Sequence, residues 1–320
     1  MTDERILDFI KKRDGGYVSG EELSEALGIS RTAVWKHVEK LRDEGYDIAA
    51  SPHLGYKLIS APDRLTGIEL KWELNTELIG KKIYSYKEIG STNEAAYDLA
   101  MSGEEEGSVV VAEYQTKGRG RMGRKWISPK GKGAYFSMIL RPDILPREIS
   151  SITLLSSLAV AKTIREKLGL KALIKWPNDV LINSGKVCGI LTEMNAEPDK
   201  INFIVLGIGI NINTKEEMLP EGASSLMAEK GEEVSRLEFV RQLLECIDKY
   251  YKIFNSGKIS DIIKEYKALS AVLDRRVQIN YHNRLVSGHV LDVDKEGALI
   301  LRMDSGLNER ILAGDVTMLR

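Results

Sequence analysis

The stretch "SGEELSEALGISRTAVWKHVEKLRDEG", residues 19–45, decides the fold of the first part of the chain. It contains two helical patterns that are separated by Ile29 alone. Ser19 and Ser30 stand where helix N-caps are expected, and Gly28 ends the first pattern as a left-handed residue commonly does. Two short helices joined by so tight a link predict a helix-turn-helix.

The sequence on either side extends this motif. "ERILDFIKKR" (4–13) places its apolar residues at helical spacing and predicts a helix before the motif. "YDIAAS" (46–51), the turn "PHLG" (52–55) and "YKLI" (56–59) predict a two-stranded hairpin after it. Helices followed by a hairpin are the arrangement of a winged helix-turn-helix domain.

The second helix of the motif carries the candidate DNA contacts. Val34, Val38 and Leu41 recur at positions i, i+4 and i+7, so they face inward. The predicted DNA-binding residues lie in the first turn of this helix and on its outer face: Ser30, Arg31, Thr32, Trp35 and Lys36. Arginine can bind guanine with two hydrogen bonds, and hydroxyls and lysines reach phosphates or base edges. A solvated helix face is the alternative for any single charge, but the place in the motif favours DNA binding.

A linker and a longer mixed region follow. "SAPDRLTG" (60–67) has the composition of a linker. Helices are expected at 93–101, about 149–168 and 235–255. The expected strands are "KIYSYKEI", "SVVVAEYQ", "AYFSMIL", "LIKWPNDVLI", "VCGILTEM" and "FIVLGIGINI". This mixture predicts an α+β domain built on one main sheet.

After residue 270 the pattern changes to short strands that are separated by glycine and polar turns. They are "RRVQINY", "RLVSGHVLDVD", "GALILRM" and "NERILAGDVTML". Such a pattern predicts a small all-β barrel. We therefore expect three domains, over residues 1–62, 63–270 and 271–320.

The bulk composition narrows the class of protein. With 43% hydrophobic and 29% charged residues, the 320-residue chain is typical of globular proteins. A net charge of −1 gives no global field for nucleic acid, so any such site must be local. Cys188 and Cys246 lie in apolar contexts that favour inert thiols, and the four histidines lack metal-ligand spacing. Without a secretory segment or a long apolar run, we expect a cytoplasmic protein with no membrane partner.

The loop "GRGRMGRKW" (118–126) is the most unusual stretch of the α+β region. Its three glycines have the Gly-x-Gly-x-x-Gly spacing of a dinucleotide-binding turn, but a Ser-Pro, two glycines and a strand follow where a helix is required. A phosphate loop fails for the same reason, and Arg124 stands where its lysine is required. What remains is a mobile backbone with several guanidinium groups, which suits a phosphate or carboxylate ligand. An exposed basic turn is the alternative.

Four further motifs place polar or small residues at strand ends. They are "GSTNEAAYDLA" (90–100), "KWPNDVLI" (175–182), "GKVCGIL" (185–191) and "GIGININ" (207–213). The first opens with a Ser91-x-x-Glu94 capping box, and the third puts Lys186 at the mouth of an apolar strand. Glycines in a strand can mark the close approach of a ligand. Taken singly, each motif is equally compatible with an ordinary cap, turn or strand.

Together and in this order, the motifs resemble the biotin–protein ligase family. The segments that carry the resemblance are "GSTN", "QTKGRGRMGRKWISPKGKG", "KWPND", "GKVCGIL", "GIGININ" and "ASSL". With the winged helix in front, the whole chain is similar to bifunctional biotin–protein ligases that are also biotin operon repressors. The resemblance implies a central α+β catalytic domain like that of the biotin and lipoyl ligases over 63–270, and an SH3-like β-barrel over 271–320. Met122 lies where the pattern leaves the residue free.

The resemblance also implies a reaction. Biotin and ATP would form biotinyl-5′-adenylate, and biotin would pass to a lysine of a biotin carboxyl carrier protein. Mg²⁺ would come with ATP, near Asp179 and without a fixed protein site. The implied catalytic residues are Lys186, Arg119 and Arg121. The implied biotin-binding residues are Ser91, Thr92, Asn93, Gln115, Arg119, Gly120, Arg121, Lys186, Gly189 and Gly207. The implied ATP and adenylate contacts are Arg119, Arg121, Arg124, Trp126, Lys175, Asn178, Asp179 and Asn211.

A regulatory role is implied as well. With biotinyl-5′-adenylate bound, the protein would form a homodimer whose two winged helices reach a palindromic operator of biotin genes. Two alternatives remain, a lipoate ligase relative and a biotin-sensing repressor with impaired catalysis.

Overall fold

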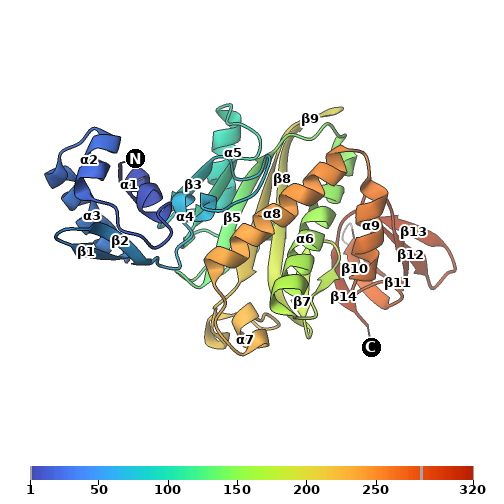
Figure 1. Ribbon diagram of the computed structural model, residues 1–320. Coiled ribbons are helices and arrows are strands. Elements are labelled where there is room, and N and C mark those ends of the chain that lie inside the picture. Colours follow the sequence, from blue (N-terminus) through green and yellow to red (C-terminus); the bar gives the residue numbers. More distant parts are fainter. Residues whose placement is uncertain (1, 282–283, 320) are drawn as a thin grey trace. The chain divides into compact units, whose positions relative to one another are not determined.

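The computed structural model describes residues 2–281 and 284–319 (Figure 1). The chain divides into two compact units between Arg64 and Leu65. Each unit has its own apolar core, so each is described separately.

The first unit contains the predicted helix-turn-helix and hairpin. Its elements are α1 (Thr2–Lys11), α2 (Gly20–Leu27), α3 (Arg31–Asp43), β1 (Asp47–Ser51) and β2 (Gly55–Ser60). The hydroxyl oxygens of Ser19 and Ser30 accept hydrogen bonds from backbone N–H groups in the first turns of α2 and α3. Gly28 ends α2 with a φ of 66°, which a residue without Cβ adopts easily. Both helix boundaries therefore lie where their capping residues predict.

An apolar stripe on each helix holds the first unit together. Its buried residues are Ile6, Leu7, Ile10, Val18, Leu23, Val34, Val38, Leu41, Tyr46 and Ile48. The strands β1 and β2 pair antiparallel, with Ala49 opposite Lys57. The outer face of α3 stays free of this core, as its spacing predicts.

The second unit is built on a seven-stranded sheet (Figure 1). Its strands, in spatial order, are β3 (Ile83–Tyr86), β4 (Val109–Ala112), β5 (Gly133–Leu140), β9 (Lys200–Asn211), β8 (Gly185–Glu197), β7 (Asp179–Ile182) and β6 (Leu173–Lys175). The strands β3 and β4 are parallel, and all other neighbours are antiparallel. The long antiparallel pair β8–β9 places Gly189 directly opposite Gly209.

Helices cover both faces of this sheet. They are α4 (Gly67–Lys71), α5 (Thr92–Met101), α6 (Ser150–Leu168), α7 (Leu226–Lys230), α8 (Arg236–Asn255) and α9 (Ile259–Ala268), with short 3₁₀ turns at Arg121–Gly123, Pro146–Glu148 and Glu216–Met218. Side chains alternate along β4: Val110 packs with α5, and Val109 and Val111 join the main core on the other face. Figure 1 shows α6 and α8 side by side over that second face, where they pack together.

A five-stranded antiparallel sheet ends the chain. Its spatial order is β13 (Asn308–Ile311), β12 (Leu299–Met303), β11 (Arg284–Val293), β10 (Arg276–Tyr281) and β14 (Asp315–Met318). The prediction of one strand over "NERILAGDVTML" is wrong, because the chain turns there and forms β13 and β14 on opposite edges. Gly314 allows this turn, since a Cβ there would lie 2.5 Å from Cγ2 of Ile279. We call residues 312–314 the β13–β14 turn.

The predicted fold class is confirmed: an amino-terminal winged helix-turn-helix, a central α+β domain and a strand-rich carboxyl-terminal part. Three helices of the second unit, α4, α7 and α9, were not expected from the sequence. Across the described residues, no helix has the length and apolar character needed to cross a membrane.

Candidate active site

The arginine loop, residues 116–132, connects β4 to β5 and folds back on itself. The backbone N–H of Gly120 donates to the carbonyl of Arg124, and that of Trp126 donates to the carbonyl of Gly118. Met122 takes a φ of 56° within the 3₁₀ turn, and extended backbone follows at Arg124. No helix begins after the last glycine, so the loop has the geometry of neither a dinucleotide turn nor a phosphate loop.

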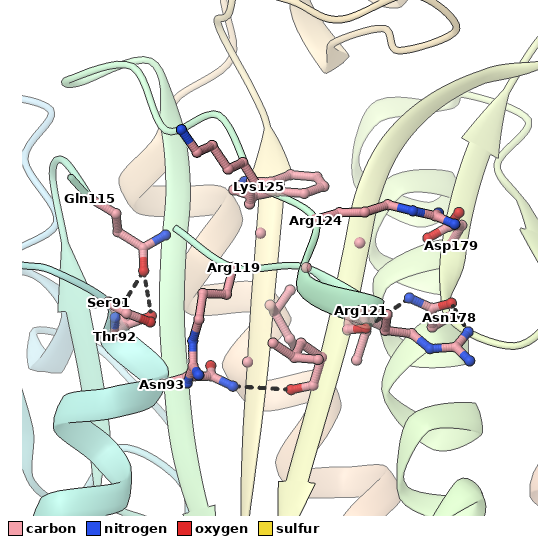
Figure 2. A pocket seen from close by; sticks show the side chains of 18 of the residues that line it. Ser91, Thr92, Asn93, Gln115, Arg119, Arg121, Arg124, Lys125, Asn178 and Asp179 are labelled. Carbon is pink, nitrogen blue, oxygen red and sulfur yellow. Dashed lines mark hydrogen bonds between the residues drawn. The ribbon is translucent and has the colours of Figure 1, made fainter. Parts of the chain in front are cut away.

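This loop covers a cavity at one end of the central sheet (Figure 2). Most lining residues belong to α5, the arginine loop and strands β7, β8 and β9, and one begins β14. Ser91, Gln115 and Asn178 directly precede α5, the arginine loop and β7. They are Ser91, Thr92, Asn93, Gln115, Arg119, Gly120, Arg121, Arg124, Lys125, Trp126, Asn178, Asp179, Lys186, Gly189, Ile190, Leu191, Gly207, Ile208, Gly209 and Asp315. Every predicted biotin-binding residue is among them.

One end of the cavity is lined by neutral polar groups. The Oε1 atom of Gln115 accepts a hydrogen bond of 2.8 Å from the backbone N–H of Thr92, and its Nε2 donates to Ser128. Ser137, fully buried on β5, lies within hydrogen-bonding distance of both Thr92 and Asn93. Figure 2 shows Ser91, Thr92, Asn93 and Gln115 gathered on this side. We call this the head-group end.

The helix start beside it differs from the predicted capping box. Ser91 occupies the N-cap position of α5, but its side chain accepts no cap hydrogen bond. Ser91 is instead buried and lines the cavity. Its hydroxyl is therefore not committed to holding the helix.

The opposite end of the cavity carries charge. Lys186 Nζ lies 2.6 Å from Asp179 Oδ1 and 5.6 Å from the centre of the Trp126 ring. Arg121 donates to Asn178 Oδ1 at 2.9 Å and to the carbonyl of Gly314. Burial lowers the pKa of Arg121, while Asp315 and Asp179 oppose that shift. This end, which we call the charged end, offers a lysine and a guanidinium at the mouth of the cavity.

The carboxyl-terminal sheet contributes to the charged end. Arg124 forms an ion pair with Asp315, the first residue of β14. Together with the Arg121 contact to Gly314, this pair ties the arginine loop to the β13–β14 turn. Asp315 and the turn were not among the predicted site residues, because nothing in a short polar turn distinguishes it from any other.

Arg119 behaves differently from its neighbours. Its Nη2 lies 3.1 Å from Glu193 Oε2, and its Nε lies 3.7 Å from Glu94 Oε1. Figure 2 shows its side chain directed toward Asn93 and away from Arg124 and Asp179. Its guanidinium thus lies at the head-group end, although the sequence predicted that Arg119 contacts the adenylate.

Glycines on β8 and β9 make room for side chains of the protein itself. A Cβ on Gly209 would lie 2.5 Å from Cε2 of Trp126, and one on Gly189 would lie 2.8 Å from Cζ3 of the same ring. A Cβ on Gly207 would lie 1.9 Å from Oδ1 of Asn93. These glycines therefore seat Trp126 and Asn93, and so shape the cavity indirectly.

Two predicted ATP contacts lie outside the cavity lining. Lys175 ends β6, in register with Asp179 across the hairpin, and is not a lining residue. Asn211 is buried, and its amide donates to the backbone carbonyls of Ser224 and Lys186. The side chain of Asn211 therefore braces the end of β9 against the following loop.

Neither cysteine is a candidate nucleophile. Cys188 is fully buried, and burial raises the pKa of its thiol well above neutral pH. Burial also raises the pKa of Cys246. Among residues 2–281 and 284–319, no three histidine, cysteine or acidic side chains are grouped as metal ligands.

The candidate DNA contacts lie on the first unit. Arg31, Thr32, Trp35 and Lys36 are exposed on α3, and the Trp35 side chain is 52% exposed. Arg31 forms an ion pair of 2.7 Å with Glu21, but both side chains are about two-thirds exposed (65% and 64%), so the pair is weak and readily exchanged. An exposed tryptophan beside two cations is unusual on a solvated face.

Comparison with known proteins assigns the chain to a family. The chain is 37% identical to the bifunctional ligase/repressor BirA of Bacillus subtilis (strain 168), over 98% of this chain and 97% of that protein. The chain belongs to the BirA family. The BirA of Escherichia coli (strain K12) is 31% identical over 95% of this chain and 94% of its own length.

Three family models match successive parts of this BirA-family chain. Residues 3–57 match a helix-turn-helix (HTH) domain, residues 86–211 match the biotin/lipoate A/B protein ligase family, and residues 272–319 match the biotin protein ligase C terminal domain. Among solved structures, the biotin protein ligase of Aquifex aeolicus in complex with biotin and ATP aligns with a TM-score of 0.64 and 29% identity. That alignment covers 75% of this chain and 99% of the other.

Proposed function

We propose that the protein is an ATP-dependent biotin–protein ligase that also represses transcription. It activates biotin as biotinyl-5′-adenylate with release of pyrophosphate, and transfers biotin to the amine of a lysine of a biotin carboxyl carrier protein with release of AMP. The observation that carries this proposal is a cavity with neutral hydrogen-bonding groups at one end and Lys186, Arg121 and Arg124 at the other.

The cavity suits the two substrates in a fixed orientation. The ureido group of biotin binds at the head-group end, among Ser91, Thr92, Gln115 and Asn93, and the valerate carboxylate extends toward Lys186. The carboxylate then meets the α-phosphate of ATP at the charged end. Joining two anions requires cations that are already in place, because their charge is worth most where the charge of the transition state develops. The structure with biotin and ATP of the Aquifex aeolicus relative supports this pair of ligands.

Each charged residue receives a role on this basis. Lys186 bridges the carboxylate and the α-phosphate, and Asp179 orients its ammonium group through their 2.6 Å contact. Arg121 and Arg124 bind the phosphates, with Asn178 orienting Arg121. Asn211 braces the framework of the site, and the guanidinium of Arg119 holds the loop at the head-group end.

Trp126 closes the cavity between the two ends. Its indole N–H is buried without a hydrogen-bond partner in the described part of the chain. A buried donor of this kind is costly unless a ligand accepts from it. Trp126 therefore covers the adenylate and helps to exclude water from an intermediate that hydrolyses readily.

Magnesium fits this site as a companion of ATP. Asp179 lines the charged end of the cavity, and it is already paired with Lys186. Mg²⁺ commonly binds proteins through one or two carboxylates together with substrate phosphates. Asp179 would supply that contact, and the ion would neutralise charge on the polyphosphate.

The repressor activity rests on the first unit. We propose that the adenylate, when it is not consumed, favours a homodimer whose two α3 helices enter successive major grooves of a palindromic operator of biotin genes. The contacts would come from Ser30, Arg31, Thr32, Trp35 and Lys36. We further propose domain limits of 1–62, 63–270 and 271–320, and action in the cytoplasm, where ATP and carrier proteins are available.

A biotin-dependent exchange of pyrophosphate into ATP tests the ligase proposal. Wild-type protein should exchange label with biotin and not with lipoate. Faster exchange with lipoate would identify a lipoate ligase relative. Biotin binding without exchange would identify a sensor with impaired catalysis.

A further inference from the structure

A continuous chain of polar side chains runs beneath the head-group end. It begins at Arg119 on the arginine loop, crosses strands β8 and β5, and returns to the same loop at Ser128. Its members, in order of contact, are Arg119, Glu193, Asn93, Ser137, Thr92, Gln115 and Ser128. Glu193, on β8, is the one member that carries negative charge, and it lies outside the residues that line the cavity.

Glu193 fixes the orientation of the Asn93 amide. The Nδ2 of Asn93 lies 2.7 Å from Glu193 Oε2 and 3.4 Å from the carbonyl oxygen of Leu191. A carboxylate and a carbonyl can only accept hydrogen bonds, so the amide nitrogen must face them. The Oδ1 of Asn93 then faces Ser137, at 2.6 Å. Asn93 is 5% exposed, so water does not offer an alternative partner.

This orientation passes along the chain to Thr92. Ser137 has one hydroxyl hydrogen, which it donates to Oδ1 of Asn93. The Thr92 hydroxyl lies 2.8 Å from that of Ser137 and 3.1 Å from Gln115 Oε1, which can only accept. Because the hydrogen of Ser137 is used by Asn93, the one hydrogen of Thr92 goes to Ser137 or to Gln115, and the Thr92 oxygen keeps the capacity to accept. An oxygen in this state suits an N–H donor of the ligand.

We propose that Glu193 is a positioning residue that sets the hydrogen-bond polarity of the head-group end, so that the site selects an N–H donor such as that of a ureido ring. This inference rests on the proposed biotin ligase function. Glu193 also lies 3.1 Å from Nη2 of Arg119, and this contact holds the start of the arginine loop at the head-group end. Glu193 acts through Asn93 and Arg119 and touches no ligand itself.

Replacement by glutamine tests the role of the charge. Glu193→Gln keeps the size of the side chain but supplies an amide that can face Asn93 with either end, so the polarity of the chain is lost. We expect the KM for biotin in pyrophosphate exchange to rise roughly ten-fold or more, as for the loss of a charged hydrogen bond. The kcat and the KM for ATP should change less than about three-fold, because the charged end is untouched.

Two further variants sharpen the comparison. Glu94→Gln is the matched control, because Glu94 also approaches Arg119, at 3.7 Å, but contacts no member of the chain beyond it. Its KM for biotin should stay close to that of the wild type. Glu193→Asp keeps a group that can only accept, so it should bind biotin better than Glu193→Gln, although it is shorter. Desthiobiotin retains the ureido ring but lacks the thioether ring. In Glu193→Gln its affinity should fall by the same factor as that of biotin.

Each outcome decides the proposal. A biotin KM for Glu193→Gln within about two-fold of the wild type overturns it, as does an equal rise in the KM values for biotin and ATP, which would indicate general disruption. Glutamine outperforming aspartate also overturns it, because packing would then matter more than polarity. Wild-type protein without biotin-dependent exchange would instead refute the ligase proposal itself.

Discussion

At the scale of single residues, the proposed activation of biotin depends most directly on Lys186. Lys186→Ala removes the cation between carboxylate and phosphate, and we expect exchange at saturating substrates to fall about 10²- to 10³-fold. The thermal unfolding midpoint should change little, because Lys186 is partly exposed. Lys230→Ala, a lysine paired with Glu232 away from the cavity, is the control. Near-normal exchange by Lys186→Ala would contradict the assigned role.

Gly209 determines the position of Trp126. Gly209→Ala would place a Cβ 2.5 Å from the indole ring, so the ring must move into the cavity or out of it. We expect biotin binding, measured by calorimetry, to weaken at least about ten-fold, in line with a displaced buried aromatic side chain. Gly20→Ala is the control, because its Cβ would meet only Tyr56 at 3.7 Å. Unchanged affinity in Gly209→Ala would show that the ring does not cover the ligand.

Single residues also show how far the sequence alone could lead. The motifs predicted which segments of the chain come together around the cavity, because the resemblance to the ligase family rests on whole segments. They could not predict that Arg119 pairs with Glu193, 74 positions away, because that contact depends on strand register. Nor could they show that Asn211 faces two backbone carbonyls, because an amide in a glycine-rich strand looks equally suited to a ligand.

At the scale of elements, a buried ion pair fastens α8 to the sheet. Arg236, 3% exposed, donates to Glu113 Oε2 at 2.9 Å and to the carbonyl of Gly133. Glu113 Oε1 also accepts from the backbone N–H of Leu65. Arg236→Met leaves the carboxylate buried without its partner, and we expect the free energy of unfolding in urea to fall by about 3–5 kcal/mol.

The same helix supplies a matched control. Lys252, near the other end of α8, pairs with Glu77, and both side chains are at least half exposed. Lys252→Met should cost at most about 1 kcal/mol. Equal losses in the two variants would mean that burial does not govern these ion pairs.

Side-chain caps marked some helix starts but did not decide which helices could be predicted, since the five-residue helices α4 and α7 are capped by Thr66 and Ser225 and were not expected. The serines before α2 and α3 marked both helix starts, because their hydroxyls accept from the first turn. Helix α9 has no side-chain cap, although Ile262, Ile263 and Tyr266 are buried along one side of it. Polar turns gave the strand boundaries within a few residues, but not the reversal at Gly314, which depends on close contact with Ile279.

At the scale of the whole molecule, ligation and DNA binding should be separable. Lys36→Ala alters an exposed residue of α3 in the first unit, whereas the cavity lies in the second. We expect weaker binding to a biotin-gene operator and a salt dependence that is shallower by about one ion, measured by fluorescence anisotropy. Exchange activity should be unchanged. A loss of exchange would indicate that the first unit contributes to catalysis.

Removal of magnesium should stop pyrophosphate exchange without changing the thermal stability of the protein. EDTA should stop exchange, because the polyphosphate would lose its counter-ion. The unfolding midpoint of the protein without nucleotide should stay the same, because residues 2–281 and 284–319 hold no cluster of three metal-binding side chains. A lower midpoint in EDTA would reveal a structural metal.

The contact between the β13–β14 turn and the arginine loop restricts how this chain can be recombined with its relatives. A chimaera that takes about its last 50 residues from another protein replaces both Gly314 and Asp315. The carbonyl of Gly314 accepts from Arg121, and the carboxylate of Asp315 pairs with Arg124. Such a hybrid can fold correctly in both parts and still hold in the wrong place the two arginines that we propose bind phosphate. For protein engineering, the loop and the turn therefore form one exchangeable module, although Arg124 and Asp315 lie 191 positions apart in the sequence.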